Sequence, residues 1–350
     1  MGILRIFTYC LIALLLSGCY ETFSPDIDEK PVLCINALIK AGEPVDVKIT
    51  HTWVYSDFEA MKNHEVKDAL VSVYANDERV NEEYIPKEGD RIRIVAKSDK
   101  YGSAESETVV PFSTMPKLID WDMDIISQNV FSDEEYAINI FLYFNLLIKL
   151  EISDVSNLED YYHISFKSFS LNFPLSDENL KDPDYFHDNY LFYDSGYLDY
   201  NAEPLFFENV EELESIYGNE SGFNFFTDKL FSGSSYTLNL LFVGCKYQLR
   251  TNVCDPDFFD CGEMITLHSV SKSYYDWEYY YNQINLGLLD DLTEWGFNDP
   301  IWGYSNVSTG AGVVAAESSV NIIVNLKDKL KNLLNPMFMD SIPENRFRNR

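Results

Sequence analysis

Positive charge is scarce in this sequence of 350 residues. Lysine and arginine together number 26, against 57 aspartates and glutamates, so the formal net charge is −31. Proteins that bind nucleic acid or anionic lipid surfaces need positive potential where they make contact. The composition therefore excludes nucleic acid as an expected partner, and we interpret the acidity as a solubilising surface charge.

The sequence also lacks the motifs of common catalytic sites. It contains no GxSxG turn of a serine hydrolase, and no histidine lies in the HExxH spacing of a zinc protease. The glycine-rich segment NVSTGAG lacks the lysine of a phosphate-binding loop, so we expect a tight turn between strands. His163 and His268 fall on predicted strands, where a structural role is expected. We therefore predict a protein that is not an enzyme, and polymer hydrolysis is kept only as a third hypothesis.

The N-terminal apolar run, from Ile6 to Leu16, is too short to cross a bilayer as a helix, which takes about 20 residues. It follows Arg5 and leads into LSGC, which ends at Cys19. This pattern is typical of a lipoprotein signal peptide over residues 1–18. Acyl chains such as palmitate on Cys19 would then anchor the protein to a membrane, and residues 19–30 would form a polar tether. The alternative is a plain secretory signal with an incidental cysteine.

The remaining cysteines predict disulfides. Cys10 leaves with the signal peptide, and four cysteines stay in the mature chain: Cys34, Cys245, Cys254 and Cys261. An exported compartment permits disulfides, and four cysteines allow three pairings. Cys254 and Cys261 flank a short acidic loop and form the expected pair, which leaves Cys34 with Cys245. Zinc is disfavoured because CxxC spacing is absent.

The acidic loop that follows Cys254 also suggests a metal site. It offers four carboxylates as hard oxygen ligands for calcium: Asp255, Asp257, Asp260 and Glu263. Their spacing differs from that of an EF-hand. The alternative is a solvated loop closed by the disulfide, and no other cofactor is expected.

Alternating apolar residues predict strands over much of the chain, so the expected fold class is mainly β. Residues 31–112 predict an immunoglobulin-like or transthyretin-like β-sandwich with short strands and Gly, Asn and Asp turns. Residues 117–327 predict a larger β-rich domain, with strands at 138–152, 161–173, 236–242, 264–270 and 321–326. One helix is expected from Ser271 to Asn285, with Ser271 or Ser273 near its start. Residues 328–350 are expected to be a C-terminal tail.

Three aromatic residues flank the glycine-rich turn, namely Trp295, Trp302 and Tyr304. Their rings are candidates for stacking on a sugar or a peptide, or for docking on a protein partner. The alternative is packing at the seam between the two domains.

Four segments together resemble a known family. They are LSGC followed by PVLCINALI, then DALVSVYANDERV with the later VVP, then FTDKLFSGSSYTLNLLF, and finally LHSVSKSYYDWEYYYNQ with FNDPIWGYSNVSTGAGVVAA. The chain thereby resembles a Bacteroidota lipoprotein family, domain of unknown function number 4249, over nearly the whole mature chain. The middle of the chain, about residues 173–224, carries no part of the resemblance.

The resemblance implies a cellular role. Members of this family often sit beside TonB-dependent outer-membrane transporters, so it implies a lipid-anchored protein of the outer membrane, on its periplasmic or cell-surface face. The expected function is that of an accessory or ligand-binding lipoprotein in nutrient uptake, with a TonB-dependent β-barrel transporter as partner. The alternative is a structural or adhesive surface lipoprotein without a small-molecule ligand.

Overall fold

The computed structural model describes residues 30–53, 62, 64–81, 83–132, 138–154, 159–171, 191–193, 196–199, 202–207, 224–251, 260–285 and 303–329. The protein is mainly β, as predicted. The chain forms two compact units, Met1–Pro31 with Trp53–His64, and Val32–Thr52 with Glu65–Arg350. Few residues of the first unit are described, and within it the rings of Trp53 and His64 lie 5.1 Å apart. The second unit contains every strand described below.

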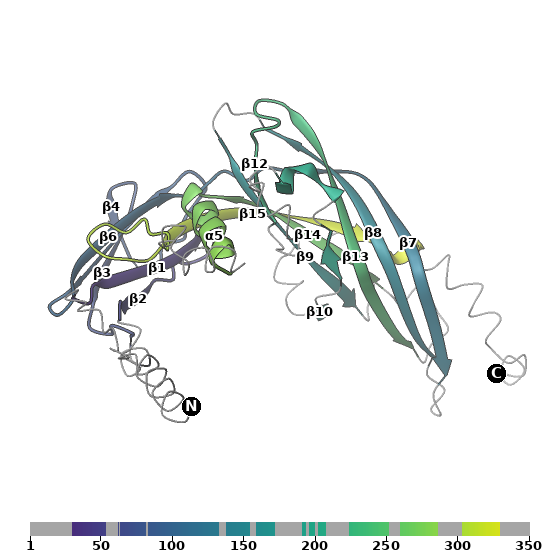
Figure 1. Ribbon diagram of the computed structural model, residues 1–350, viewed down its shortest axis with the longest axis horizontal. Coiled ribbons are helices and arrows are strands. Elements are labelled where there is room, and N and C mark those ends of the chain that lie inside the picture. Colours follow the sequence, from purple (N-terminus) through teal and green to yellow (C-terminus); the bar gives the residue numbers. More distant parts are fainter. Residues whose placement is uncertain are drawn as a thin grey trace, which may run out of the picture. The chain divides into compact units, whose positions relative to one another are not determined.

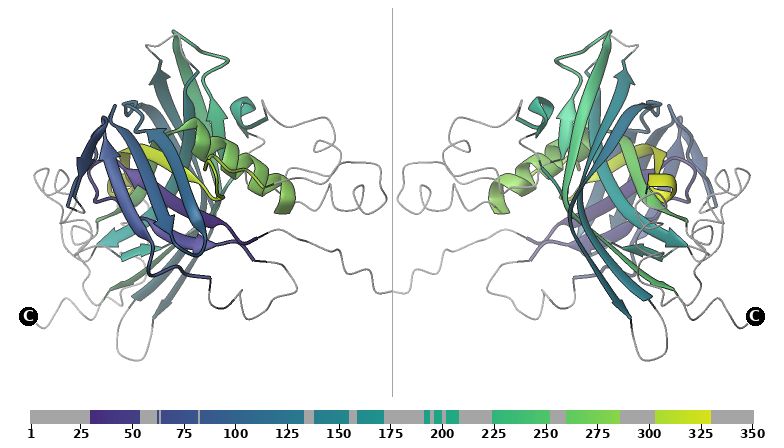
Figure 2. Two further views of the ribbon diagram at one scale, coloured as in Figure 1. Left: turned by 90° about the vertical axis from the view of Figure 1, so that its left-hand side faces the viewer. Right: turned by 90° about the vertical axis from the view of Figure 1, so that its right-hand side faces the viewer.

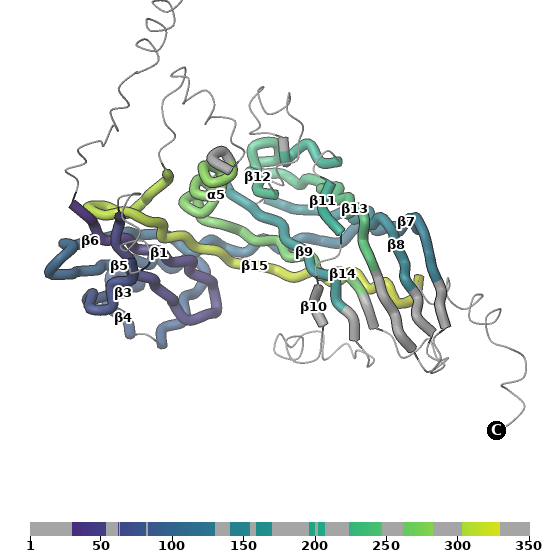
Figure 3. The backbone as a smooth tube through the Cα atoms, turned by 60° about the horizontal axis from the view of Figure 1, so that its bottom comes forward, coloured from purple at the N-terminus to yellow at the C-terminus, as the bar shows by residue number. Residues whose placement is uncertain are grey.

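The largest sheet contains seven strands, in the order β10-β9-β14-β15-β1-β2, with β12 paired to β9 (Figure 1). These are β1 (Leu33–Lys40), β2 (Lys48–His51), β9 (Tyr161–Leu171), β10 (Leu191–Tyr193), β12 (Phe225–Thr227), β14 (Asp260–Val270) and β15 (Val314–Asn325). The beginning of β15 pairs in parallel with β1, and the rest pairs antiparallel with β14 (Figure 3). The first and last strands that the structure describes are therefore neighbours.

A four-stranded antiparallel sheet, β4-β3-β5-β6, shares a core with β1 and the beginning of β15. Its strands are β3 (Leu70–Ala75), β4 (Glu78–Val80), β5 (Arg91–Ser98) and β6 (Gly102–Val109). Alternate residues supply the core, since successive side chains of a strand point to opposite faces. Leu33 and Ile35 of β1 meet Ile92 and Ile94 of β5, and Val314 of β15 joins them. The immunoglobulin-like or transthyretin-like assignment of residues 31–112 stays a prediction.

A second four-stranded sheet, β11-β13-β8-β7, shares the larger core with β9, β14 and the end of β15. Its strands are β7 (Lys117–Ser132), β8 (Ile138–Ser153), β11 (Tyr197–Leu198) and β13 (Ser235–Thr251). Leu146 of β8 and Leu240 of β13 are fully buried, as is Ile265 of β14 across the core. A short 3₁₀ helix, η3 (Pro204–Phe207), adds Leu205 and Phe206 to this core. Strand β7 was not predicted, and β13 is longer than predicted.

The predicted helix is present as α5 (Lys272–Asn285), and it packs against β15 and β9 of the seven-stranded sheet (Figure 2). Ser271 caps its first turn, because the Ser271 hydroxyl oxygen accepts the N–H of Tyr274 at 3.3 Å. The same oxygen accepts the N–H of Ala316 at 3.0 Å, which ties the helix start to β15. Tyr275 is buried in a small cluster with residues of β12 and β14. The expectation that Ser271 lies at the helix start is confirmed.

Candidate functional site

A groove of about 350 Å³ lies between α5 and the face of the sheet formed by β1 and β15. Tyr274, Trp277 and Glu278 of α5 form one wall, since residues three and four apart share a helix face. Leu38 of β1 and Ala315 of β15, which pair in register, contribute to the other side. Ala315 points toward α5 because its neighbours Val314 and Ala316 point into the opposite core.

Aromatic side chains extend this groove along α5. Trp277 is 36% exposed, Tyr280 40% and Tyr281 51%. The rings of Trp277 and Tyr281 stack with centroids 5.6 Å apart, one helical turn from each other. Tyr304, from the segment that precedes β15, stacks on Tyr280 at 6.0 Å. Exposed aromatic rings beside a groove of ligand size are typical of a binding surface.

Glu278 is the acidic group of the groove. Burial raises the pKa of its carboxyl group above the ordinary glutamate value. The Asn36 side chain is another polar group in the lining, and the remaining surface is mostly apolar. The groove is therefore suited to a ligand or partner side chain with an apolar body and a polar end. A larger hollow of about 760 Å³ is lined by Val45, Val47 and residues of β3 and β4 at the rim of the N-terminal core.

A second group of polar residues lies on neighbouring strands of the seven-stranded sheet. Ser165 of β9 lies 2.9 Å from Nε2 of His268 on β14. Nδ1 of His268 lies 3.2 Å from Oε2 of Glu317 on β15, and Lys40 of β1 is 3.6 Å from the other carboxylate oxygen. The ring of His163 stacks on that of His268 at 4.9 Å, because the two residues pair in register.

The electrostatics of this group follow from burial and close charges. Burial lowers the pKa of His163 to about 3, and the neighbouring His268 adds to this shift. His163 is therefore neutral, and its Nε2 accepts a hydrogen bond from the Asn224 amide at 2.8 Å. Burial opposes ionisation of Glu317, but His268 and then Lys40 hold the pKa of its carboxyl group below the ordinary value.

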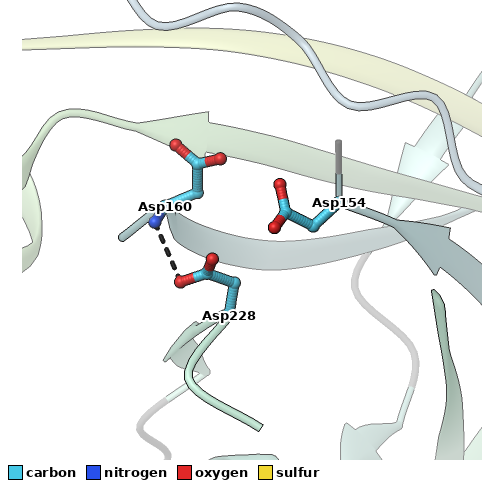
Figure 4. Close-up of side chains that lie close together, drawn as sticks. All are labelled: Asp154, Asp160 and Asp228. Carbon is cyan, nitrogen blue, oxygen red and sulfur yellow. Dashed lines mark hydrogen bonds between the residues drawn. The ribbon is translucent and has the colours of Figure 1, made fainter. Parts of the chain in front are cut away.

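Three aspartates converge at the junction of β8, β9 and β12 (Figure 4). Asp154 follows β8, Asp160 precedes β9, and Asp228 follows β12. One carboxylate oxygen from each lies within 4.8 Å of the other two. Asp228 accepts the N–H of Asp160 at 2.9 Å, and the N–H of Gly233 donates to Asp154 at 2.6 Å. Burial raises the pKa of Asp228, and the negative charge of Asp154 raises it further.

The expected disulfide between Cys34 and Cys245 is wrong, because both residues are free thiols. Cys245 is fully buried in the larger core, where burial raises the pKa of its thiol to about 12. Cys34 belongs to β1, where its neighbours Leu33 and Ile35 fill the N-terminal core. Thus the two thiols lie in different parts of the fold. Cys254 and the side chain of Cys261 are outside the described residues.

Glu263 was expected in the acidic loop, but it belongs to β14 and is 2% exposed. Strand alternation turns its carboxyl group inward, where it accepts a hydrogen bond from the hydroxyl of Ser168 on β9. Burial raises the pKa of Glu263 to about 8. Asp255, Asp257 and the side chain of Asp260 are outside the described part of the chain, so calcium binding by this loop stays a prediction.

Of the other predicted site residues, some are described by the structure and some are not. Tyr304 does join the aromatic surface on α5, whereas Trp295 and Trp302 lie outside the described residues. The signal peptide and Cys19 lie outside them too. Sequence patterns did not reveal the aspartate cluster or the contact between Ser165 and Glu317 through His268. Asp154 and Asp228 lie 74 positions apart in the sequence, so no local pattern indicates that they are in contact. Only the pairing of the strands brings such distant residues together.

Within the described ranges, none of the helices has the length and apolar character needed to cross a membrane. Residues 20–322 match the family described as "Domain of unknown function (DUF4249)". Among curated proteins, none matches the chain.

Proposed function

Because the chain belongs to the DUF4249 family, whose description assigns no function, we propose a function from the residues of the chain and, for the uptake system, from what the family resemblance implies. The protein is a membrane-anchored accessory lipoprotein without enzymatic activity. It binds a ligand or a protein partner through α5 as part of a TonB-dependent outer-membrane uptake system. The LSGC motif at Cys19 and the net charge of −31 support an exported, anchored protein that does not bind nucleic acid.

The observation that carries the binding role is the aromatic row on α5. Trp277 and Tyr281 expose large rings beside a groove of about 350 Å³. Large aromatic residues contribute much of the affinity at protein interfaces, because they bury a large area with few rotatable bonds. A helix whose outer face serves only solubility would instead carry polar or charged residues.

A pull-down in mild detergent from the native membrane tests this proposal. We expect the full chain to co-purify with a β-barrel transporter, and a Trp277→Ala/Tyr281→Ala double variant to lose it while it remains membrane-bound. Tyr197→Ala is the matched control, since Tyr197 is 66% exposed on β11, away from α5.

Two results would count against the proposal. Recovery of the unmodified chain alone, at normal expression, would refute the association with a transporter. Undiminished recovery of the transporter by the double variant would refute the role of α5.

Release of a Cys19→Ser variant from the membrane is expected, because the lipid is the proposed anchor.

One specific arrangement favours a second candidate, a serine-type hydrolase. Ser165, His268 and Glu317 follow the order of nucleophile, base and acid, with contacts of 2.9 Å and 3.2 Å. A fluorophosphonate reagent would form a covalent bond to an activated serine. Labelling at Ser165 that disappears in a His268→Gln variant would establish this candidate, and our leading proposal expects no labelling.

A further inference from the structure

The three converging aspartates lie at ends of elements that come from two sheets. Asp154 directly follows β8 of a four-stranded sheet, whereas Asp160 directly precedes β9 of the seven-stranded sheet. Asp228 lies in the turn between β12 and β13, where its N–H bonds to the carbonyl oxygen of Asp160 at 3.1 Å. These backbone contacts hold the three side chains on one side of the junction (Figure 4).

The spacing of the carboxylates fits a single cation. One oxygen of each aspartate lies within 4.8 Å of the others. Calcium binds oxygen at about 2.3–2.6 Å, so two ligands on opposite sides of one ion are at most about 5 Å apart. The set contains only carboxylate oxygens, which suit calcium and magnesium rather than zinc. Magnesium requires a shorter and stricter octahedral geometry, so calcium is the better match.

A separate observation concerns Asp228 alone. The residue is 1% exposed, yet its Oδ2 atom has no hydrogen-bond partner. Its other oxygen is the one that accepts the N–H of Asp160, so Oδ2 points toward the carboxylates of Asp154 and Asp160 (Figure 4). The Ser232 hydroxyl is a neutral group that lowers the pKa of Asp228, but no basic side chain pairs with Asp228 within the part of the chain that the structure describes; the neighbouring Lys229 pairs with Glu159 instead. Buried polar atoms are normally satisfied, and an unsatisfied acceptor directed at two other acids indicates a missing positive partner.

We propose that Asp154, Asp160 and Asp228 bind one calcium ion. The ion supplies the partner that Oδ2 of Asp228 lacks and reduces the repulsion among three clustered carboxylates. It links the end of β8 to the start of β9 and thereby fixes the two sheets around the larger core at this corner. This site is distinct from the groove on α5 and does not depend on the function proposed above.

Calcium binding to the chelator-treated, purified full chain tests the proposal. Calorimetry should show saturable binding with a Kd of about 10⁻⁴ to 10⁻³ M, as in extracellular calcium-binding modules. The melting temperature should rise with calcium concentration, because the ion binds the folded state. Terbium provides a second probe. Burial raises the pKa of Tyr162, and the charges of all three aspartates raise it further, so this ring lies near the site and can sensitise terbium emission.

Asp228→Asn should weaken calcium binding about tenfold or more, because it removes a charged ligand. Asp124→Asn, at an exposed position on β7, is the matched control and should bind like the unmodified chain. If Asp228→Asn does not fold, Asp160→Asn provides the same comparison at a half-buried position. The variants also separate this site from the loop that contains Asp255 and Asp257.

The proposal is overturned if about 10 mM calcium changes neither the heat signal nor the melting temperature. It is also overturned if Asp228→Asn and Asp160→Asn respond to calcium as strongly as Asp124→Asn. A protein that is stabilised only by lowering the pH, and not by calcium, would show that a proton on Asp228 occupies this role instead.

Discussion

Replacement of Glu263 by glutamine should make the protein more stable at alkaline pH. The carboxyl group of Glu263 is 2% exposed, and its two oxygens lie 2.9 Å and 2.8 Å from the hydroxyl of Ser168. One hydroxyl has a single proton, so it satisfies only one of the two oxygens. Burial raises the pKa of Glu263 from 4.5 to about 8. The folded protein therefore holds this proton over a range in which the unfolded chain has released it.

The sign and size of the effect follow from this difference. Between the unfolded and folded pKa values the native state binds more protons, so stability falls as the pH rises from about 4.5 to about 8. Each pH unit in this window costs about 1.4 kcal/mol. A neutral amide of the same shape has no such dependence. The free energy of unfolding of Glu263→Gln, relative to the unmodified protein, should thus gain about 4 kcal/mol between about pH 5 and pH 8.

Equilibrium urea unfolding at several pH values measures this difference. Glu43→Gln is the matched control, since Glu43 is exposed in the turn after β1, and its curve should run parallel to that of the unmodified protein. Parallel curves for Glu263→Gln as well would refute the reasoning, because they would show that the Glu263 carboxyl group titrates as it does in the unfolded chain.

Three further predictions follow from other described residues. The pKa of His163 is about 3 in the folded protein, against 6.5 for the free residue, so stability is lost as the pH falls below about 6.5. In His163→Gln, the midpoint of urea unfolding should therefore fall less steeply with decreasing pH. Gly310→Ala should lower the melting temperature by at least several degrees, since its Cβ would lie 2.4 Å from the Leu33 carbonyl oxygen, whereas Gly303→Ala meets nothing within 4 Å and should be neutral. Ser271→Ala should cost about 1 kcal/mol, because the N–H of Ala316 loses the hydroxyl acceptor and the N–H of Tyr274 keeps only the Ser271 carbonyl oxygen, and amide exchange at the start of α5 should speed up.

The sequence predicted those elements whose side chains alternate without interruption. Strand β1 places Leu33, Ile35 and Ile39 in the core at every second position, and this pattern is visible in the sequence. The helix α5 was predicted because Ser271 precedes a long run without glycine or proline. In both cases the residues that make the pattern recognisable in the sequence are also those that hold the element in the folded structure.

Strand β7 was not predicted because its pairing with β8 is irregular. Its register against β8 shifts between Leu118 and Asp120, and again between Ile125 and Ser127. Each irregularity adds a residue to one strand, so the alternation of inward and outward side chains changes phase. Strand β13 has a similar shift between Phe242 and Cys245, and the prediction ended at that point. Gly244, with φ of +67°, adopts the left-handed backbone conformation there.

The candidate sites were harder to predict than the strands. Tyr304 was identified because aromatic residues gather near the glycine-rich turn, but the groove itself requires α5 to pack beside β1. The link from Ser165 to Glu317 depends on which strands are neighbours in the sheet. Cysteine counting failed for Cys34 and Cys245, since it takes no account of burial or of the direction of a side chain on its strand.

The position of β15 has a consequence for synthesis of the chain. Asn36 and Val313 contact each other across 277 residues, and β1 gains its parallel neighbour only when Val314–Asn325 is available. Until then the backbone of β1 has an open edge next to apolar side chains, a state that favours pairing with other chains. A ribosome must therefore complete almost the entire polypeptide before its first strand is protected, and premature termination before Val314 should yield aggregates rather than a folded N-terminal fragment.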